Sequence, residues 1–443
     1  MLLCGCLSAQ WLETTIALPD TSMPGAMLCN PAAGKLYVAN TTSAHGTVDV
    51  VDAAANVFVK AIPCGVNPAS LCFNSANNKL YAAAAYGTAV TIIDADADTV
   101  IKHLAIGTWP GPLVYHAPSN RIYCGSGGDR TIAVIDGAGD SVIHRIAVAH
   151  MPDYVCLNPG MNKLYVSIHS QSRVEVIDCA ADTICARLTV GETPGMMCYN
   201  PMQNRVYVAL DVGNDVAVID CSADTVMRPI PVGVWPTYVC YSPGVNKVFA
   251  ATTGNNNVGI IDCQTDSVRS YVTIPGTPGA IDVDTIHNRV YCTDRDGGKV
   301  VVIDGASDSA IATVTVGAKP DHLYWSAQRQ RMYVANSWDQ TISVLRDSAA
   351  AVAEQRSTPD ASRITPGASI VRGVLYLLPS PFPLPLGEGQ EVREWNLLDI
   401  SGRSVMPLES GANDVSRLAP GLYFARLAVG TRRSTTTKVV VTR

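Results

Sequence analysis

The sequence predicts an all-β protein, an eight-bladed β-propeller followed by a small C-terminal β-sandwich. An aromatic residue recurs eight times, first after 44 residues and then six times at intervals of 42. A proline precedes each aromatic residue by 13 positions, and a lysine or arginine precedes it by two. A fixed period of about 42 residues is typical of one four-stranded propeller blade. The aromatic residues are Tyr37, Tyr81, Tyr123, Tyr165, Tyr207, Phe249, Tyr291 and Tyr333, and the prolines are Pro24, Pro68, Pro110, Pro152, Pro194, Pro236, Pro278 and Pro320.

Each repeat contains four short runs of β-branched and aromatic residues that are separated by glycine, proline, asparagine and aspartate. This pattern predicts strands joined by hairpin turns. In the clearest repeat the strands are expected at 154–157, 163–167, 174–177 and 184–190. An Asn-Pro-Gly turn follows the first strand, and a turn bounded by Asp178 and Asp182 follows the third.

The last repeat lacks its fourth strand, because the segment after residue 346 is rich in alanine and has no strand pattern. The segment 11–18 (WLETTIAL) resembles a fourth strand and precedes Pro24 as the other fourth strands precede their prolines. We therefore expect the N-terminal strand to complete the eighth blade and to close the ring over residues 11–346. Closure removes the exposed strand edges that an open array would leave. A seven-bladed ring is the alternative.

Several copies of the repeat resemble a known family. Tyr37-Val38-Ala39-Asn40 and residues 333–336 look like the signature of the YVTN β-propeller repeats, as does Val176-Ile177-Asp178 at the end of a third strand. The resemblance implies the propeller fold. Family members include surface-layer and other extracytoplasmic proteins, and distant relatives include lyases and dehydrogenase subunits. Many members have seven blades, whereas eight repeats are present here.

The segments outside the repeats suggest export. Residues 1–10 (MLLCGCLSAQ) are apolar and end in small residues, which resembles the tail of a secretory signal. Residues 347–365 are polar and rich in alanine and serine, as expected of a linker. Strand signals return in residues 366–443, with the best candidates at 374–378, 395–399, 422–427 and 438–442.

This C-terminal region resembles the sorting domain of type IX secretion substrates. The matching pieces are 378–381 (LPSP), 397–403 (LLDISGR), 418–424 (LAPGLYF) and 438–441 (KVVV). The proline-rich segment 382–393 departs from that family, and a generic accessory sandwich is the alternative. The resemblance implies an extracellular or outer-membrane-attached bacterial protein that has the outer-membrane secretion machinery as a partner.

Composition narrows the classes of partner. The net charge is −6, and the part before residue 350 holds 21 basic against 30 acidic residues. An acidic propeller without a basic stripe argues against nucleic acid as a partner. No stretch is long and apolar enough to suggest a membrane span. The fourteen cysteines mostly follow the repeat and are expected to be small core residues, with Cys179 and Cys185 the one pair that could form a disulfide.

The chain shows no recognised catalytic or metal-binding constellation. The four histidines predicted to lie in loops, His45, His150, His169 and His322, belong to four different repeats, and no nucleophile motif, paired-histidine motif or phosphate loop is present. Paired aspartates recur at a spacing of four, and the segment 94–98 begins like a calcium loop but lacks the glycine at the sixth place. We therefore expect the aspartates to cap turns. We predict no metal, no cofactor and no catalytic residue.

The loops on one face of the ring are the predicted binding site. Connections from fourth to first strands and from second to third strands share this face, so the residues that flank the prolines lie near the channel mouth. The candidates mix aromatic and charged side chains, which suits recognition. They are Trp109, His150, Asp153, Tyr154, Trp235, Tyr238, Lys319, Asp321 and His322, and the neighbouring loops add His169, Asp211, Asp294, Arg295 and Trp338.

Three classes of function remain open on the sequence alone. The first is a secreted or cell-surface protein that binds a ligand or another protein through these loops. The second is an extracytoplasmic enzyme of the lyase or lactonase type with its site at the same mouth. The third is a structural protein of the cell envelope.

Overall fold

The structure is a computed structural model that describes residues 10–19, 22–30, 32–41 and 46–347 and the strands of the C-terminal region. The chain forms two compact units, Met1–Ala351 and Val352–Arg443. The predicted signal-like segment before residue 10 and nearly all of the predicted linker lie outside the described residues.

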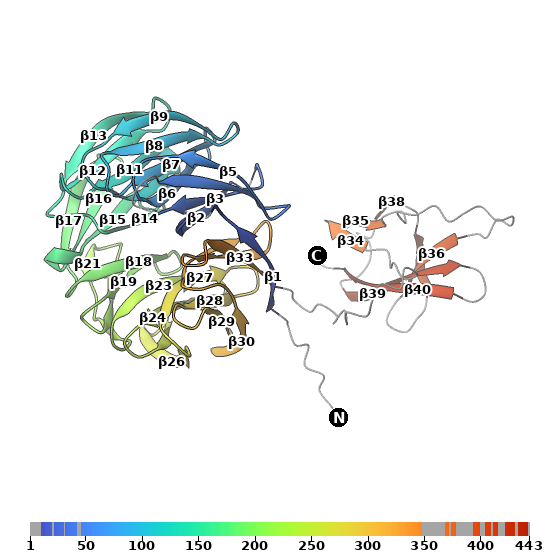
Figure 1. Cartoon of the computed structure of the whole chain (residues 1–443). Helices are drawn as coiled ribbons and strands as arrows, with labels where there is room; N and C mark the ends of the chain where they lie inside the picture. Colours follow the sequence, from blue (N-terminus) through green and yellow to red (C-terminus); the bar gives the residue numbers. More distant parts are fainter. Residues whose placement is uncertain are drawn as a thin grey trace. The chain divides into compact units, whose positions relative to one another are not determined.

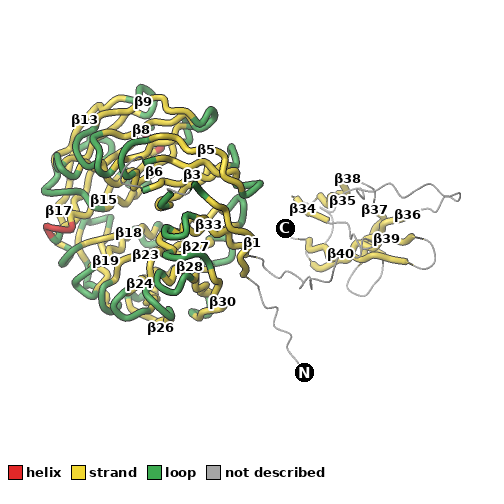
Figure 2. The backbone as a smooth tube through the Cα atoms, in the orientation of Figure 1, coloured by secondary structure: helices red, strands yellow, loops and turns green. Residues whose placement is uncertain are grey.

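The first unit is an eight-bladed β-propeller, as predicted. Eight antiparallel sheets follow one another around a ring; in seven of them the first strand in sequence is the inner one, and in the eighth β31 is the inner strand and β1 the outer one (Figure 1). Figure 2 shows strand and loop throughout, with only short helical segments. The first four blades are β2 (Pro24–Asn30), β3 (Lys35–Asn40), β4 (Thr47–Asp52) and β5 (Val57–Pro63); β6 (Pro68–Asn74), β7 (Lys79–Ala84), β8 (Ala89–Asp94) and β9 (Thr99–Ala105); β10 (Pro110–His116), β11 (Arg121–Ser126), β12 (Thr131–Asp136) and β13 (Ser141–Ala147); and β14 (Tyr154–Asn158), β15 (Lys163–Ile168), β16 (Arg173–Asp178) and β17 (Thr183–Thr189).

The other blades follow the same order, except that blade 5 has an interrupted outer strand. Pro229 and Pro231 lack the backbone N–H that a continuous outer strand would donate, so two short pieces replace one strand. These blades are β18 (Pro194–Asn200), β19 (Arg205–Leu210), β20 (Asp215–Asp220), β21 (Thr225–Val226) and β22 (Ile230–Pro231); β23 (Pro236–Ser242), β24 (Lys247–Thr252), β25 (Asn257–Asp262) and β26 (Ser267–Thr273); β27 (Pro278–Asp284), β28 (Arg289–Asp294), β29 (Lys299–Asp304) and β30 (Ser309–Thr315); and β31 (Pro320–Ser326), β32 (Arg331–Asn336) and β33 (Thr341–Asp347).

The N-terminal strand β1 (Gln10–Ala17) closes the ring, as predicted from the orphan segment. It pairs antiparallel with β33 and is the outer strand of blade 8. The register shifts at Glu13, whose carboxylate accepts two hydrogen bonds from the Arg331 guanidinium, at 2.7 and 2.5 Å. Ile16 is 3 % exposed and packs in a cluster that contains residues of blades 8 and 1. The closure is therefore a packed and ion-paired seam.

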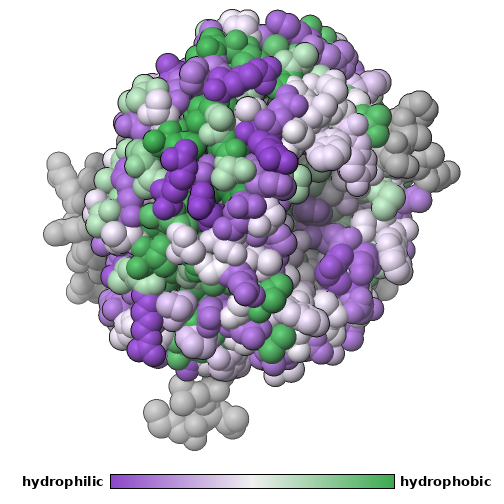
Figure 3. Space-filling model, turned by 90° about the vertical axis from the view of Figure 1, so that its left-hand side faces the viewer, coloured by the Kyte–Doolittle hydropathy of each residue, from purple (hydrophilic) through white to green (hydrophobic). Residues whose placement is uncertain are grey.

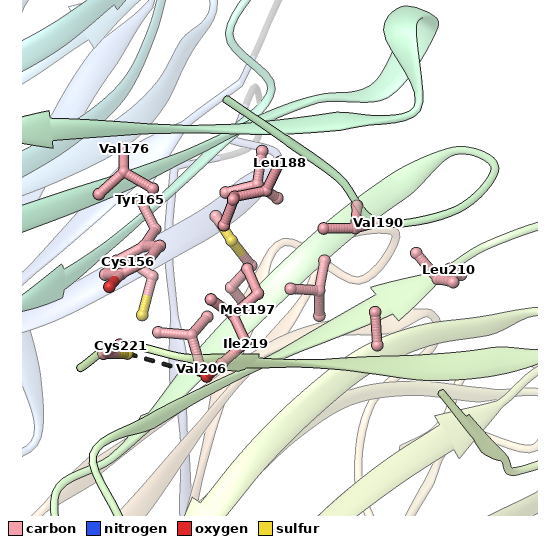
Figure 4. Close-up of a cluster of buried hydrophobic side chains, with 13 residues drawn as sticks. Cys156, Tyr165, Val176, Leu188, Val190, Met197, Val206, Leu210, Ile219 and Cys221 are labelled. Carbon is pink, nitrogen blue, oxygen red and sulfur yellow. Dashed lines mark hydrogen bonds between the residues drawn. The ribbon is translucent and has the colours of Figure 1, made fainter. Parts of the chain in front are cut away.

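The core lies between neighbouring blades. Each repeat alternates residues that face the blade before it and residues that face the blade after it, so a row of interfaces replaces one central core. Figure 4 shows one interface, in which Tyr165 and Val176 of blade 4 meet Met197, Val206 and Ile219 of blade 5. The eight repeated aromatic residues are completely buried, and burial of such side chains contributes about 1.5–3 kcal/mol each.

In several blades the basic residue that precedes the repeated aromatic residue forms an ion pair with an aspartate of the next blade, and we call this contact the blade clamp. Lys35 Nζ of blade 1 lies 2.7 Å from Asp98 Oδ2 in the turn between the third and fourth strands of blade 2. Tyr37 Oη donates a hydrogen bond to the other oxygen of Asp98 at 2.8 Å. The same ion pair recurs at 2.6–2.7 Å in Lys79–Asp140, Arg121–Asp182, Lys163–Asp224, Arg205–Asp266 and Lys247–Asp308.

The paired aspartates therefore have two roles, and the prediction that both cap turns is half correct. The first aspartate caps its turn: Asp178 Oδ1 accepts the N–H groups of Ala180 and Ala181. The second adopts the left-handed conformation, with φ of 53° at Asp182, and its carboxylate turns toward the preceding blade. The spacing alone could not reveal this second role, because the partner lies 61 residues earlier in the sequence.

The described cysteines are all free thiols. Most are buried, in agreement with their predicted place in the core, but the suggested disulfide between Cys179 and Cys185 is wrong. Cys179 is buried and Cys185 is exposed on the outer strand β17. Burial raises the pKa of the Cys179 thiol to about 11, so this sulfur stays protonated at neutral pH.

The second unit contains two antiparallel sheets. The first joins β34 (Ala368–Val371), β35 (Val374–Leu377) and β38 (Gly411–Asp414), and the second joins β37 (Ser404–Leu408), β36 (Arg393–Leu398), β39 (Gly421–Val429) and β40 (Arg433–Val441). The four predicted strands of this region correspond to β35, β36, β39 and β40. Within the described residues of the whole chain, no helix is long and apolar enough to cross a membrane.

Candidate functional site

One face of the propeller carries the connections between blades and the loops between second and third strands, and we call it the loop face. Its backbone is fixed by a repeated hydrogen bond. The carbonyl of the residue before the blade proline accepts the N–H of the residue seventeen positions after that proline, as in Thr193–Asp211 at 3.1 Å and Thr277–Arg295 at 2.9 Å. Asp211 and Arg295 therefore stand on loops that are held to the neighbouring connection.

Three aspartates and their neighbours converge at the inner edge of this face. We define the mouth cluster as Asp153, Tyr154, His169, Asp211, Tyr238, Arg295, Asp321, His322 and Ser337. The members come from three positions of the repeat: one, two and seventeen residues after the proline. Five of these nine residues belong to the nine candidates predicted from the sequence, and three more were predicted as neighbouring loop residues. Ser337 was not predicted.

The part of the mouth cluster on blades 7 and 8 is internally paired. Arg295 Nε donates to Asp321 Oδ1 at 2.6 Å, and Ser337 Oγ donates to Asp321 Oδ2 at 2.5 Å. Gly279 permits this arrangement, since a Cβ atom there would lie 2.6 Å from Cγ of Arg295. Burial lowers the pKa of His322, Asp321 raises it and Arg295 lowers it further, so the imidazole is neutral at pH 7.

The part on blades 4 and 5 carries acidic groups that have no lysine or arginine partner among the described residues. Asp153 Oδ2 accepts the backbone N–H of His169 at 2.7 Å. Asp211 lies against Gly195, where a Cβ atom would be 2.8 Å from Asp211 Oδ1. Among the described residues, Asp211 Oδ1 is buried without a hydrogen-bond donor, and no lysine or arginine pairs with Asp153 or Asp211.

The electrostatics of these carboxylates follow from burial. Burial raises the pKa of Asp211 to about 6; His169 opposes this and Asp153 adds to it. Burial, with the charges of Tyr238, Asp211 and Asp153, raises the pKa of Tyr154 to about 12. Burial also raises the pKa of Tyr238. The phenols of Tyr154 and Tyr238 therefore keep their protons at neutral pH, while Asp211 titrates near the physiological range. The arrangement can accept hydrogen bonds or a positive charge from a ligand.

The two predicted tryptophans lie on the loop face, in the connections that precede β10 and β23. Trp109 and Trp235 are 56 % and 55 % exposed, and both have φ of 56°, an uncommon conformation for a bulky residue. The Trp109 N–H donates to Gly87 O at 3.1 Å and its carbonyl accepts from Gly127 N–H at 2.9 Å, which ties the loops of blades 2 and 3 together. Among the described residues, neither indole forms a hydrogen bond or ring contact with the mouth cluster.

The remaining predicted residues lie around the same face. His150 is close enough for its charge to affect Asp153, and Nδ1 of His150 is buried without a partner among the described residues. The Lys319 ammonium lies 5.3 Å from the centroid of the Trp338 ring. Asp294 is buried at the end of β28 and accepts the N–H of Gly297, so it shapes a loop and does not face the mouth. Within the described residues no group of three or more histidine, cysteine or acidic side chains is arranged to hold a metal ion.

One buried acid at the channel was not predicted. Asp282, on the inner strand β27, accepts the backbone N–H of Trp325 in the next blade at 2.7 Å. Burial raises its pKa to about 6, against two backbone hydrogen bonds that lower it. The signal was available in the sequence, because Asp282 occupies the position that is cysteine at Cys72, Cys156, Cys198 and Cys240.

Comparisons with known proteins agree with the fold. Hydrazine synthase of Kuenenia stuttgartiensis contains a chain that aligns with 75 % of this chain and 97 % of its own length, with a TM-score of 0.54 and 18 % identity. At that identity the likeness shows the fold alone. No curated protein matches the sequence significantly. The family model of YNCE-like β-propellers matches residues 6–331, which is most of the chain. The eight repeats, the closed ring and this match together place the protein in the YNCE-like β-propeller family.

Proposed function

We propose that the protein is a secreted or cell-surface binding protein that recognises a polar ligand at the mouth cluster, and that its C-terminal region directs export. The observation that carries the proposal is Asp211, a carboxylate on a fixed loop with one buried oxygen that has no hydrogen-bond donor among the described residues. Leaving a buried acceptor unpaired costs about 1–3 kcal/mol. A ligand that supplies the missing donor recovers that free energy on binding.

The distribution of exposed aromatic side chains supports the same face. Of six exposed aromatic residues in the described part of the chain, five lie on the loop face: Tyr86, Trp109, Tyr154, Trp235 and Trp338. Aromatic side chains are enriched in recognition surfaces because they bury a large area with few rotatable bonds. In contrast, polar and apolar residues alternate without a continuous apolar belt over the part of the surface shown in Figure 3. The partner therefore meets a rim of aromatic residues around a polar centre.

The experiment is a ligand screen followed by matched variants. Purified full-length protein is screened by thermal shift against amino acids, polyamines, organic acids and oligosaccharides, and each stabilising compound is measured by calorimetry. Asp211→Asn keeps the shape and should weaken binding by about ten-fold or more. Asp215→Asn is the control, because Asp215 is also partly buried and stands four residues away at the start of β20. Equal affinity in the two variants, or no stabilising compound at all, contradicts the proposal.

The predicted role of the tryptophans is tested in the same assay. The double variant Trp109→Ala, Trp235→Ala should retain its stability because both rings are exposed. Loss of a binding anchor typically costs about 2 kcal/mol or more of affinity. Unchanged affinity of the double variant restricts the site to the mouth cluster and removes the two tryptophans from it.

A lyase or lactonase is the second candidate, and one observation favours it. A carboxylate with a pKa of about 6 beside protonated phenols has the properties of a general base near neutral pH. Mass spectrometry of each bound compound after incubation distinguishes the two functions. A product that forms with the native protein and is absent with Asp211→Asn establishes catalysis, and an unchanged compound supports binding alone.

A further inference from the structure

A cleft opens on the loop face between blades 7 and 8, and we call it the rim cleft. Its volume is about 380 Å³, within the usual range for ligand pockets of roughly 300–1,000 Å³. The floor consists of residues with little or no side chain, Gly297, Gly298, Gly317 and Ala318. A Cβ atom at Gly317 would lie 2.8 Å from Asn336. The loop at position 317 therefore requires glycine.

One wall of the rim cleft is an exposed aromatic plane. Trp338 is 69 % exposed, and the Lys319 ammonium lies 5.3 Å from its ring centroid. Lys319 itself has φ of 55°, which fixes the direction in which its side chain leaves the backbone. Since most of the indole remains accessible, the ring offers an apolar platform beside a hydrogen-bond donor.

The charges of the rim cleft are balanced within the protein. Arg295 pairs with Asp321 at 2.6 Å, and Lys319 Nζ lies 3.7 Å from Asp296 Oδ1. Asp339 Oδ2 accepts the N–H of Ala318 at 2.5 Å. The carboxylates repel a negatively charged ligand, and Lys319 and Arg295 repel a positively charged one. The chemistry therefore favours a neutral ligand with many hydroxyl groups and one apolar face.

We propose that the rim cleft binds a neutral pyranose unit of a carbohydrate, with the C–H face of the sugar stacked on Trp338. The sugar hydroxyl groups donate to Asp296 and accept from Lys319 and Arg295. Hydrogen-bond donors and acceptors lie together at the rim of the cleft because each basic side chain is paired with an acid. This proposal names a ligand class for the loop face and so rests on the proposed function, but it concerns a separate set of side chains.

Arg295 connects the rim cleft to the mouth cluster. It lines the cleft and also holds Asp321 at the mouth. A saccharide of several units that starts at Trp338 therefore extends toward the channel along Arg295. Trisaccharides are expected to bind more tightly than single rings for this reason.

The test uses full-length protein and defined sugars. Methyl glucoside, N-acetylglucosamine, cellotriose and maltotriose are the neutral probes, glucuronate is the anionic probe and glucosamine is the cationic probe. Binding is followed by saturation-transfer NMR and by tryptophan fluorescence. At least one neutral probe should bind with a Kd of about millimolar or lower, and added salt should change that affinity little.

Trp338→Ala should weaken binding of that neutral probe by about ten-fold or more. Tyr271→Ala is the control, because Tyr271 is also an exposed aromatic residue, at 52 %, but lies on the outer strand β26 and not on the loop face. Urea unfolding of both variants verifies that they fold. Binding that survives Trp338→Ala, binding of glucuronate alone with strong salt dependence, or no binding of any neutral probe overturns the proposal. Asp211→Asn separates the two hypotheses: a sugar lost in Trp338→Ala and retained in Asp211→Asn supports the rim cleft without the mouth cluster.

Discussion

Replacement of Ile16 by alanine tests how the ring closes. Ile16 is 3 % exposed in β1 and packs with residues of blades 8 and 1. If β1 is docked as the outer strand of blade 8, the variant loses the buried methyl groups and leaves a cavity. Such substitutions cost about 2–5 kcal/mol, which is a large part of the roughly 5–15 kcal/mol that stabilises a typical domain.

The assay is equilibrium unfolding in urea, followed by circular dichroism. Ile101→Ala is the control, because Ile101 also lies on an outer strand, β9, but is 46 % exposed. We expect a clear fall in the unfolding midpoint for Ile16→Ala and a small one for Ile101→Ala. A second variant, Glu13→Gln, removes the charge that pairs with Arg331 and should also lower the midpoint. Equal midpoints for Ile16→Ala and Ile101→Ala would refute the closure.

Three further predictions concern the clamps, a buried acid and export. Asp266→Ala leaves Arg205 and the Tyr207 hydroxyl without their shared partner and should cost about 2–3 kcal/mol in urea unfolding, against about 1 kcal/mol for Tyr207→Phe; equal costs would show that the ion pair contributes nothing. Because the pKa of Asp282 is raised to about 6, its protonated form stabilises the fold at low pH, and that contribution is lost as the pH rises through about 6. Asp282→Asn should therefore gain stability relative to the native protein between about pH 4 and pH 7, and parallel pH profiles of the two proteins would contradict this. Residues 366–443 fused to a periplasmic reporter should move it to the surface or medium of a host with type IX secretion, and a reporter that stays in the periplasm would count against the sorting role.

The fold could be predicted from the sequence because one pattern of proline, basic and aromatic residues occurs eight times. The repeated aromatic residue is completely buried in all eight blades, and the basic residue pairs with the next blade in six of them, so many copies of one pattern reduce the ambiguity of any single segment. The closure was predictable from a missing strand at one end and an unassigned strand at the other. These are local patterns, and the structure confirms eight blades and the pairing of β1 with β33.

The site was less predictable because it depends on contacts between distant residues. The repeat placed Asp153, Tyr238 and Asp321 near the channel, but the unpaired oxygen of Asp211 depends on the contact with Gly195 and on the absence of a lysine or arginine partner in the described residues. The ion pair of Arg295 and Asp321 joins two blades and leaves no mark in either repeat alone. Trp109 and Trp235 show the converse, since their position near the prolines does not bring them into contact with the mouth cluster.

The direction of the blade clamp has a consequence for how propellers of this kind gain or lose blades. In blades 1 to 6 a basic residue pairs with an aspartate of the next blade, so blades 2 to 6 each take part in two such junctions. A duplicated blade would enter the ring with both halves already present, as Lys163 and Asp182 illustrate within blade 4. The junction between blades 8 and 1 is different, because Arg331 meets Glu13 and the carbonyl of Ala53. Gain or loss of a whole blade therefore preserves the clamp at these internal junctions. The contacts of Arg331 with Glu13 and Ala53 are specific to the junction between blades 8 and 1.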